Sequence, residues 1–244
     1  MNHDHRYLRQ TKLDQIGEDG QQAFNNAHIL IVGVGGLGSA AAMVLAAGGI
    51  GTLTLNDFDR VEQSNLHRQI IFREHHLGEL KTHAAKTVLQ ELNSDCRIRT
   101  LDYQLEDQEL IDLIASADVV LDCSDNLSTR HAINRACVAT STPLVFGAAL
   151  RLEGQLACFN INPQSPCLHC IYNNDTANND DCENEGVLGT VPNIVGSMQA
   201  LSAQLLLTEN GEHLDRKLRL FDAFTLQWRE IKTSKNPNCS VCAN

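Results

Sequence analysis

The segment from His28 to Ala47 constrains the fold more than any other part of the sequence. An unbroken apolar run, His28 to Val32, stops at a glycine-rich turn, and the following run from Ala40 to Ala47 is strongly helix-forming. A short β-rich run, a glycine turn and a helical run predict a strand, a tight connection and a helix. This order is typical of the first unit of an α/β fold.

The same alternation continues through the next hundred residues. The apolar patterns predict a strand at 52–56, a helix at 79–92, a strand at 96–101, a helix at 107–115, a strand at 117–121, a helix at 127–140 and a strand at 144–146. Alternating strands and helices predict a parallel sheet covered on both faces. The expected fold class is therefore α/β, with a doubly wound (Rossmann-like), mostly parallel sheet.

The pattern changes after residue 150. Residues 154–160 alternate like an antiparallel strand, 192–208 return to helical spacing, and 218–221 with 227–231 suggest a closing hairpin. Between them, residues 162–185 are polar and rich in Asn and Asp. A compact domain seldom carries so long a loop without a functional reason, so we expect this loop to have one.

Gly33, Gly35 and Gly38 form the pattern Gly-x-Gly-x-x-Gly between the first expected strand and helix. At such a turn the backbone can approach a phosphate, and the helix N-terminus favours negative charge. Asp57, at the end of the second strand, is placed to accept hydrogen bonds from ribose hydroxyls. The pattern predicts a bound nucleotide without separating NAD from ATP; glycines that serve only helix-to-sheet packing are the alternative.

Charged side chains also follow the second and the fourth expected strands, at the carboxyl ends where ligands bind in parallel sheets. Arg68 offers a planar fork for phosphate oxygens and Lys81 a mobile point charge, although each alone is more often a solvated surface charge. Asp122 and Asp125 follow the fourth strand and are expected to be exposed. They offer the carboxylates that Mg²⁺ needs beside substrate phosphates, unless Asp125 or Ser124 only caps the next helix.

Four of the nine cysteines form two Cys-x-x-Cys pairs, Cys167 with Cys170 and Cys239 with Cys242. Two such pairs supply the four thiolates of a closed, structural Zn²⁺ site, which would tie the C-terminal tail to the long loop. Cys182 lies between two acids in that loop, where its thiol is expected to be exposed and poorly reactive. The remaining cysteines are expected to be small buried side chains: Cys96, Cys123, Cys137 and Cys158.

The charge balance limits the partners. A net charge of −11 argues against nucleic acid or an anionic membrane surface as the main partner. The longest weakly apolar stretch, 40–50, is too short to span a bilayer, and the polar N-terminus lacks signal-peptide character. These features, with the metal-like cysteine spacing, predict a cytoplasmic protein.

Several short motifs occur in a fixed order along nearly the whole chain. They are Arg6-Tyr7-x-Arg9-Gln10, Gly33-x-Gly35-Gly36-x-Gly38, Asp57-x-Asp59, Ser64-Asn65-Leu66-x-Arg68-Gln69, Lys81, Asp122-x-x-Asp125-Asn126, Gly147-Ala148-Ala149, Gly154-Gln155 and the paired cysteines. This ordered set resembles the ThiF/MoeB/HesA family, the bacterial relatives of the ubiquitin-activating enzymes.

The resemblance implies an adenylyltransferase. Such an enzyme uses ATP and Mg²⁺ to adenylate the C-terminal glycine of a small ubiquitin-like sulfur-carrier protein ending in Gly-Gly. The pathway stays open between molybdopterin and thiamine biosynthesis, because residues 147–155 look more like the MoeB branch and residues 221–229 more like the ThiF branch. We expect no appended rhodanese domain, and therefore a separate sulfurtransferase as a partner.

The resemblance also implies roles for individual residues. Arg9 would be an arginine finger contributed by the other subunit of a homodimer, and Cys182 would be the crossover-loop cysteine. Arg68, Lys81 and Asp125 would act on the phosphates and Mg²⁺. The implied nucleotide site contains Gly33, Gly35, Gly36, Gly38, Asp57, Asp59, Ser64, Asn65, Leu66, Arg68, Gln69, Lys81, Asp125 and Asn126.

One adenylation domain is therefore expected over residues 1–244. It would comprise an N-terminal helical arm at 1–27, a nucleotide-binding core at 28–150, and a carrier-binding part at 151–244 with a crossover loop at 162–190 and a zinc-stapled tail. Two other function classes remain as alternatives. One is a non-catalytic, zinc-stapled protein-binding module, and the other is an NAD-dependent oxidoreductase on the same fold.

Overall fold

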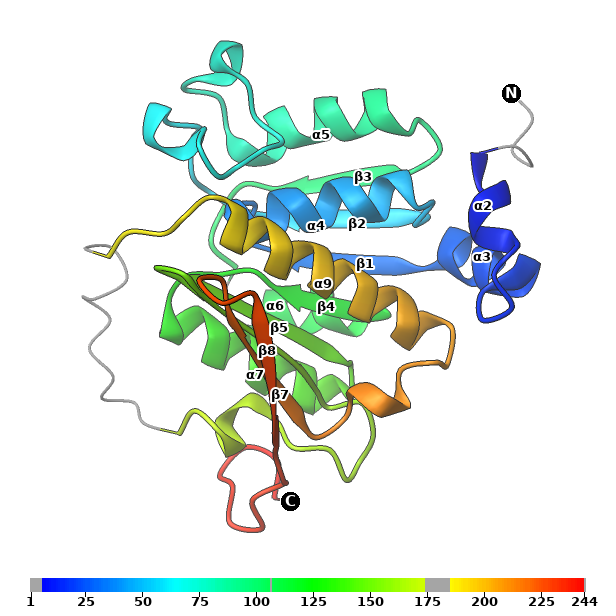
Figure 1. Cartoon of the computed structure of the whole chain (residues 1–244), viewed down its shortest axis with the longest axis vertical. Coiled ribbons are helices and arrows are strands. Elements are labelled where there is room, and N and C mark those ends of the chain that lie inside the picture. Colours follow the sequence, from blue (N-terminus) through cyan, green and yellow to red (C-terminus); the bar gives the residue numbers. More distant parts are fainter. Residues whose placement is uncertain (1–5, 106, 174–184, 244) are drawn as a thin grey trace.

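A computed structural model of the chain describes residues 6–105, 107–173 and 185–243 (Figure 1). Within these ranges a single mixed sheet has eight strands in the order β3-β2-β1-β4-β5-β6-β7-β8. The first five strands run parallel, and β6, β7 and β8 continue the sheet antiparallel. The α/β, mostly parallel sheet with C-terminal antiparallel strands is thus confirmed.

The parallel half of the sheet follows the predicted alternation closely. Its elements are β1 (His28–Val32), α4 (Gly36–Ala47), β2 (Thr52–Asn56), α5 (Lys81–Leu92), β3 (Arg97–Leu101), α6 (Asp107–Ala115), β4 (Val119–Asp122), α7 (Leu127–Thr140) and β5 (Leu144–Leu150). Short 3-10 turns, η1 (Gln63–Asn65) and η2 (Glu74–His76), interrupt the connection between β2 and α5. Two small helices, α2 (Leu8–Thr11) and α3 (Gly17–Asn26), precede β1.

The second half adds β6 (Glu153–Phe159), the 3-10 turn η3 (Leu168–Cys170), the long helix α9 (Thr190–Leu207), the 3-10 turn η4 (Glu212–Leu214), and the hairpin of β7 (Lys217–Asp222) and β8 (Gln227–Lys232). The hairpin predicted from 218–231 is confirmed by the antiparallel pairing of Leu218 with Ile231. β8 is one of the two edge strands of the sheet, and all of its residues are exposed.

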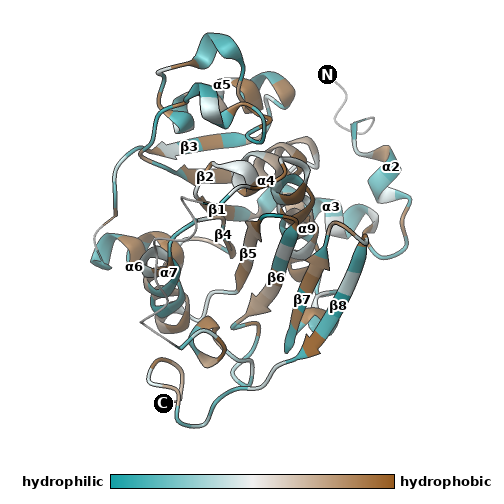
Figure 2. Ribbon diagram, turned by 60° about the vertical axis from the view of Figure 1, so that its left-hand side comes forward, coloured by the Kyte–Doolittle hydropathy of each residue, from teal (hydrophilic) through white to brown (hydrophobic). Residues whose placement is uncertain are grey.

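Two apolar layers sandwich the sheet, one on each face. Ile29 and Ile31 of β1 face α4, α5 and α9, whereas Leu30 and Val32 face α6 and α7. This alternation follows from the two-residue period of a strand, and it explains why β1 is apolar throughout. Figure 2 shows α6 and α7 on one side of the sheet, with α4 and α9 on the other.

Within the described residues, no helix is both long and apolar enough to cross a membrane.

Candidate functional site

The glycine turn after β1 is shaped by close backbone contacts. Gly33 has a φ of +91°, and a Cβ there would lie 2.7 Å from the carbonyl oxygen of Cys123. A Cβ at Gly38 would lie 1.9 Å from the carbonyl oxygen of Gly33. Neither position accepts a side chain. At Gly35, by contrast, the nearest atom to a Cβ is Nε2 of Gln69 at 3.8 Å, so this side of the turn is open.

Gln69 adds an unsatisfied polar atom at the open side of the turn. Its side chain is buried, and its Oε1 has no hydrogen-bond partner among the described residues. Gly35 is also the N-cap of α4, whose first N–H groups receive no side-chain cap. Free backbone N–H donors suit a nucleotide phosphate, and a free amide oxygen suits a sugar hydroxyl, so in this respect the site fits ATP.

Asp57 connects the glycine turn to the end of β2. Its Oδ2 accepts from the backbone N–H of Val34 at 2.7 Å, and its Oδ1 accepts from that of Asp59 at 2.9 Å. Burial raises the pKa of Asp57, and the nearby charge of Lys81 opposes this rise. The carboxylate is therefore held rigidly beside the turn, with lone pairs left over for further donors.

Lys81 and Asp59 form an ion pair that sequence reasoning did not anticipate. Lys81 Nζ lies 2.8 Å from Asp59 Oδ2, and the backbone N–H of Lys81 donates to the carbonyl of Asp59. The sequence analysis placed both residues in the nucleotide site, but it predicted no contact between them. The pair gives the buried ammonium of Lys81 an anionic partner within the chain.

The connection after β2 holds Arg68 close to the site. Asn65 is buried and takes part in the capping box of η1, and its carbonyl accepts from the backbone N–H groups of Arg68 and Gln69. The guanidinium of Arg68 donates to the carbonyl of Ser64 at 2.9 Å and lies 2.8 Å from Nε2 of His67. Leu66 is half-buried in the same turn. Within the part of the chain that the structure describes, these local contacts leave the other Arg68 donors free for an anion.

The end of β4 differs from the expectation in one respect. Asp122 was expected to be exposed, but it is fully buried, and its Oδ1 accepts from the backbone and hydroxyl of Ser124. Asp125 is exposed and therefore remains the carboxylate available to a cation. The capping alternative for Asp125 or Ser124 is wrong, because the N-cap of α7 is Asn126, whose side chain accepts from Thr129.

Gln199, on α9, is a site-building residue that the sequence analysis missed. Its Nε2 donates to the carbonyl of Asp122 at 2.8 Å and to that of Val145 at 3.2 Å. A Cβ on Gly147 would lie 2.4 Å from its amide carbon, so the glycine makes room for it. A glutamine on a mostly apolar helix was the available signal.

These residues lie at the carboxyl ends of the parallel strands β1, β2 and β4 (Figure 1). Arg9 does not join them in the same chain. It is exposed on α2, and α2 lies beyond the beginning of the strands, at the opposite edge. Cys182 lies outside the described residues.

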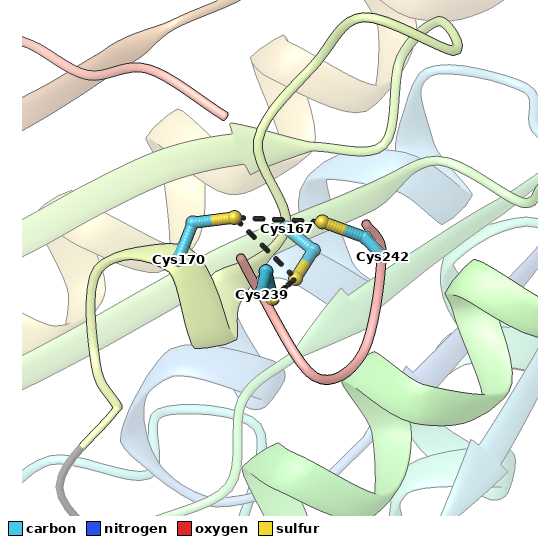
Figure 3. Close-up of side chains that lie close together, drawn as sticks. All are labelled: Cys167, Cys170, Cys239 and Cys242. Carbon is cyan, nitrogen blue, oxygen red and sulfur yellow. Dashed lines mark hydrogen bonds between the residues drawn. The ribbon is translucent and has the colours of Figure 1, made fainter. Parts of the chain in front are cut away.

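The paired cysteines gather into one cluster (Figure 3). Their sulfur atoms lie within 4.8 Å of one another, with 3.7 Å between Cys167 and Cys239 and 3.5 Å between Cys170 and Cys242. A tetrahedral ion with four thiolates at about 2.3 Å gives sulfur–sulfur distances of about 3.8 Å. The cluster can therefore hold a metal, and its four side chains would fill a tetrahedral site completely.

The four other described cysteines are buried, as predicted: Cys96, Cys123, Cys137 and Cys158. Burial raises the pKa of Cys96 to about 12 and that of Cys158 to about 12. Such thiols stay protonated at neutral pH and act as small apolar side chains.

A family model described as the ThiF family matches residues 7–241 of the sequence. The chain belongs to the ThiF family. This membership confirms the resemblance that the ordered motifs indicated.

Two curated ThiF-family relatives show how much of such proteins the chain represents. It is 41% identical to the molybdopterin-synthase adenylyltransferase of Escherichia coli (strain K12), over 97% of this chain and 95% of that protein. It is 44% identical to adenylyltransferase and sulfurtransferase MOCS3-1 of Drosophila pseudoobscura pseudoobscura, over 98% of this chain but 53% of that protein. The chain thus spans about half the length of the MOCS3 relatives.

The fold is shared with solved structures of E. coli MccB. The crystal structure of MccB with ATP superposes with a TM-score of 0.85, at 22% sequence identity, and covers 99% of this chain and 75% of that one. At this identity the comparison shows a common fold. The ThiF-family sheet, including its antiparallel extension, is therefore not peculiar to this sequence.

Proposed function

We propose that this ThiF-family chain adenylates the C-terminal glycine of a small ubiquitin-like sulfur-carrier protein that ends in Gly-Gly. The convergence of Asp57, Arg68, Lys81 and Asp125 beside an open glycine turn carries this proposal. Identity of 41% along nearly the full length of a molybdopterin-synthase adenylyltransferase supports the choice of reaction.

ATP would lie across the glycine turn. Its phosphates would meet the N–H groups at the start of α4, and its ribose hydroxyls would donate to Asp57. The site also contains Gly36 in the turn, and Ser64, Leu66 and Asn126 around it. Mg²⁺ would be held by Asp125 and by the phosphates, and it would neutralise charge on the triphosphate.

The reaction requires alignment and charge neutralisation rather than a base. A carboxylate oxygen of the carrier's terminal glycine would form a bond to the α-phosphorus. The bond from this phosphorus to the bridging oxygen would break, and pyrophosphate would leave with the electron pair. No proton moves, so the chain's contribution is to orient both anions and to stabilise the negative charge with Arg68 and Lys81.

Lys81 would change partners when the nucleotide binds. In the free chain it is paired with Asp59, and a phosphate oxygen would take the place of that carboxylate. Such an exchange keeps the buried ammonium paired in both states, which avoids the cost of an unpaired buried charge.

A second copy of the chain would complete the site. Arg9 is exposed at the edge of the sheet opposite the glycine turn, so within one chain it does not approach the nucleotide site. We propose a homodimer in which each subunit supplies Arg9 to the other's phosphates, as arginine fingers do in other phosphoryl-transfer enzymes.

The cysteine cluster would hold a structural Zn²⁺. It packs against Val138 near the end of α7, whereas α7 begins beside Asp125 at the other edge of the sheet. Twelve residues of helix separate the two ends by about 18 Å. A zinc ion there would fix the tail to η3 without touching the nucleotide.

Three further features complete the proposal. The domain would comprise a helical arm at 1–27, a nucleotide core at 28–150 and a carrier-binding part at 151–244. A covalent role for Cys182 stays a prediction from the resemblance. A sulfurtransferase is the proposed next partner of the adenylated carrier, because the longer MOCS3 relatives are named for both activities.

Carrier-dependent exchange of pyrophosphate into ATP tests the proposal. Purified protein with Mg²⁺ would be assayed in parallel with the molybdopterin and the thiamine sulfur carriers. We expect exchange with at least one carrier, and which carrier supports it would identify the pathway. A chain that binds either carrier but exchanges no pyrophosphate would instead be a binding module, and the proposal would fail.

A further inference from the structure

The first turns of α9 pack directly against both segments that build the nucleotide site. A Cβ on Gly36 would lie 2.9 Å from the ring of Pro192, and one on Gly189 would lie 2.3 Å from the carbonyl oxygen of His67. A Cβ on Gly196 would lie 2.2 Å from the carbonyl oxygen of Leu37. The beginning of this helix therefore fits between the glycine turn and the connection that carries Arg68.

Asn193 lies at the centre of this contact. Its Nδ2 donates to the carbonyl oxygen of Arg68 at 3.1 Å, and a second, short hydrogen bond runs from the same nitrogen to the carbonyl of Gly189. Both of these carbonyl oxygens are acceptors. The side-chain amide of Asn193 must therefore turn its nitrogen, rather than its oxygen, toward them. Its Oδ1 is buried and has no partner among the described residues.

This hydrogen bond ties Arg68 to a separate element of the fold. The other described bonds of Arg68 are local: its backbone N–H donates to Asn65, and its guanidinium donates to Ser64 and contacts His67. Those partners lie within four residues and move together with Arg68. Asn193 is on α9, more than a hundred residues away, so it fixes the whole turn relative to the glycine turn.

The same helix start is joined to the turn between β5 and β6. The backbone N–H of Arg151 donates to Gly186, and that of Leu188 donates to the carbonyl of Arg151. Glu185 forms an ion pair with the Arg151 side chain. Residues 185–189 therefore enter α9 from a fixed position, and Asn193 bonds to the last of them.

We propose that Asn193 is a positioning residue for the nucleotide: it holds the main chain of Arg68 so that the guanidinium points at the phosphates. The inference rests on the proposed function, since it takes Arg68 as a phosphate ligand. The inference gives α9 a role in ATP binding, although none of the nucleotide-site motifs includes a residue of this helix. Asn193 itself does not contact the reacting atoms.

Asn193→Asp tests the inference with a side chain of the same shape. The carboxylate cannot donate, and it faces two carbonyl oxygens, so the bond to Arg68 is lost and replaced by repulsion. We expect the KM for ATP to rise about tenfold, while kcat and the KM for the carrier change less than about twofold. Asn193→Ala, which loses the donors without adding charge, serves if the aspartate variant does not fold, with a smaller rise expected.

Asn160→Asp is a matched control. The Nδ2 of Asn160 also donates to two carbonyls, those of Cys137 at 2.8 Å and Thr142 at 2.9 Å, at the opposite edge of the sheet. The Asn160→Asp chain also loses two side-chain hydrogen bonds to carbonyl groups, so its thermal midpoint of unfolding should fall to a similar extent. Its ATP affinity should equal that of the natural chain.

A double variant separates positioning from general destabilisation. If Asn193 acts through Arg68, adding Asn193→Asp to Arg68→Ala should not weaken ATP binding further, as measured by titration calorimetry. Additive losses would overturn the inference, and so would an Asn193→Asp chain that binds ATP as the natural chain does. If the natural chain itself binds no ATP, the proposed function fails, and this inference fails with it.

Discussion

Lys81 donates from Nζ to Oδ2 of Asp59 across 2.8 Å, and only 8% of the lysine side chain is exposed. Removing one partner of a buried pair leaves the other charge uncompensated. Asp59 also lies beside Asp57, whose pKa is already raised, chiefly by burial. Lys81 would therefore have two tasks in the proposed site: it would attract phosphate, and it would offset two neighbouring carboxylates.

Lys81→Ala should consequently lose more activity than the loss of one surface charge would cause. We expect carrier-dependent pyrophosphate exchange to fall by about a hundredfold, the usual effect of removing one fixed charge stabiliser. Lys86→Ala, five residues further along α5, is the control and should keep its exchange rate. Equal rates for the two variants would remove Lys81 from the nucleotide site.

Mixed dimers test the proposed placement of Arg9. Arg9→Ala and Arg68→Ala homodimers should each be inactive, because each of their sites lacks one arginine. After subunit exchange, half of the dimers pair the two variants, and one of their two sites is intact, so about a quarter of the exchange activity should return. If Arg9 acted within its own chain, mixing would restore nothing.

The parallel core was the most predictable part of the fold. The limits of β1 and β2 follow from their apolar runs to the residue, because both strands are buried on both faces. α4 begins at Gly36 rather than at Ala40, inside the glycine turn. Helix propensity gives no hint of this start, because glycine is a poor helix former and tertiary packing against α9 decides it.

Long-range pairing explains most of what the sequence did not predict. β5 runs on to Leu150, rather than ending at Phe146, because β6 pairs with it antiparallel as far as Glu153. Asp122 looked like a ligand from its place after a strand, but Ser124 and Gln199 bury it. The ion pair of Lys81 with Asp59 joins residues 22 positions apart, and no local pattern indicates it.

Gly147 provides a test of the role of Gln199. A Cβ at this position would lie 2.4 Å from the glutamine amide, which has no free space to move into because it bonds Asp122 and Val145. Gly147→Ala should destabilise the chain by about 2 kcal/mol, which lowers Tm by roughly 4–8 °C. Gly186→Ala has no atom within 4 Å of the added Cβ and should leave Tm unchanged. Similar Tm values for both variants would contradict the packing argument.

The proposed contact of Asp57 with the ribose predicts that ATP binding depends on pH. Burial raises the pKa of this carboxyl, so it takes up a proton at higher pH than an exposed aspartate does. In the chain without ATP, the pKa of Asp57 is higher in the folded state than in the unfolded state. Its contribution to the stability of the fold is therefore present at low pH and is lost as pH rises through the folded pKa. ATP has the opposite preference, because the ribose hydroxyls need an ionised acceptor.

The affinity for ATP should therefore fall as pH is lowered toward the pKa of Asp57. Calorimetric titrations across this range would show the fall in the natural chain, and subtraction of the Asp57→Asn profile removes the titration of the ATP phosphates. A profile that Asp57→Asn leaves unchanged would mean that this carboxyl does not hold the nucleotide.

The cysteine cluster predicts a metal-dependent stability that is separate from catalysis. The natural chain should contain one Zn²⁺, measured by elemental analysis, because four sulfur atoms lie within 4.8 Å of one another. A chelator should lower its Tm by roughly 6–12 °C, since losing the ion frees the tail at a cost of about 3 kcal/mol. ATP affinity should stay the same, because the cluster packs against Val138 near the end of α7, about 18 Å from the beginning of that helix beside Asp125. Cys239→Ser should lose the metal and respond no further to chelator, whereas Cys158→Ser, a buried core substitution, should lower Tm yet keep both the metal and the response. A natural chain that binds no zinc, or a Cys158→Ser chain that loses it, would show that the four sulfurs do not form the site.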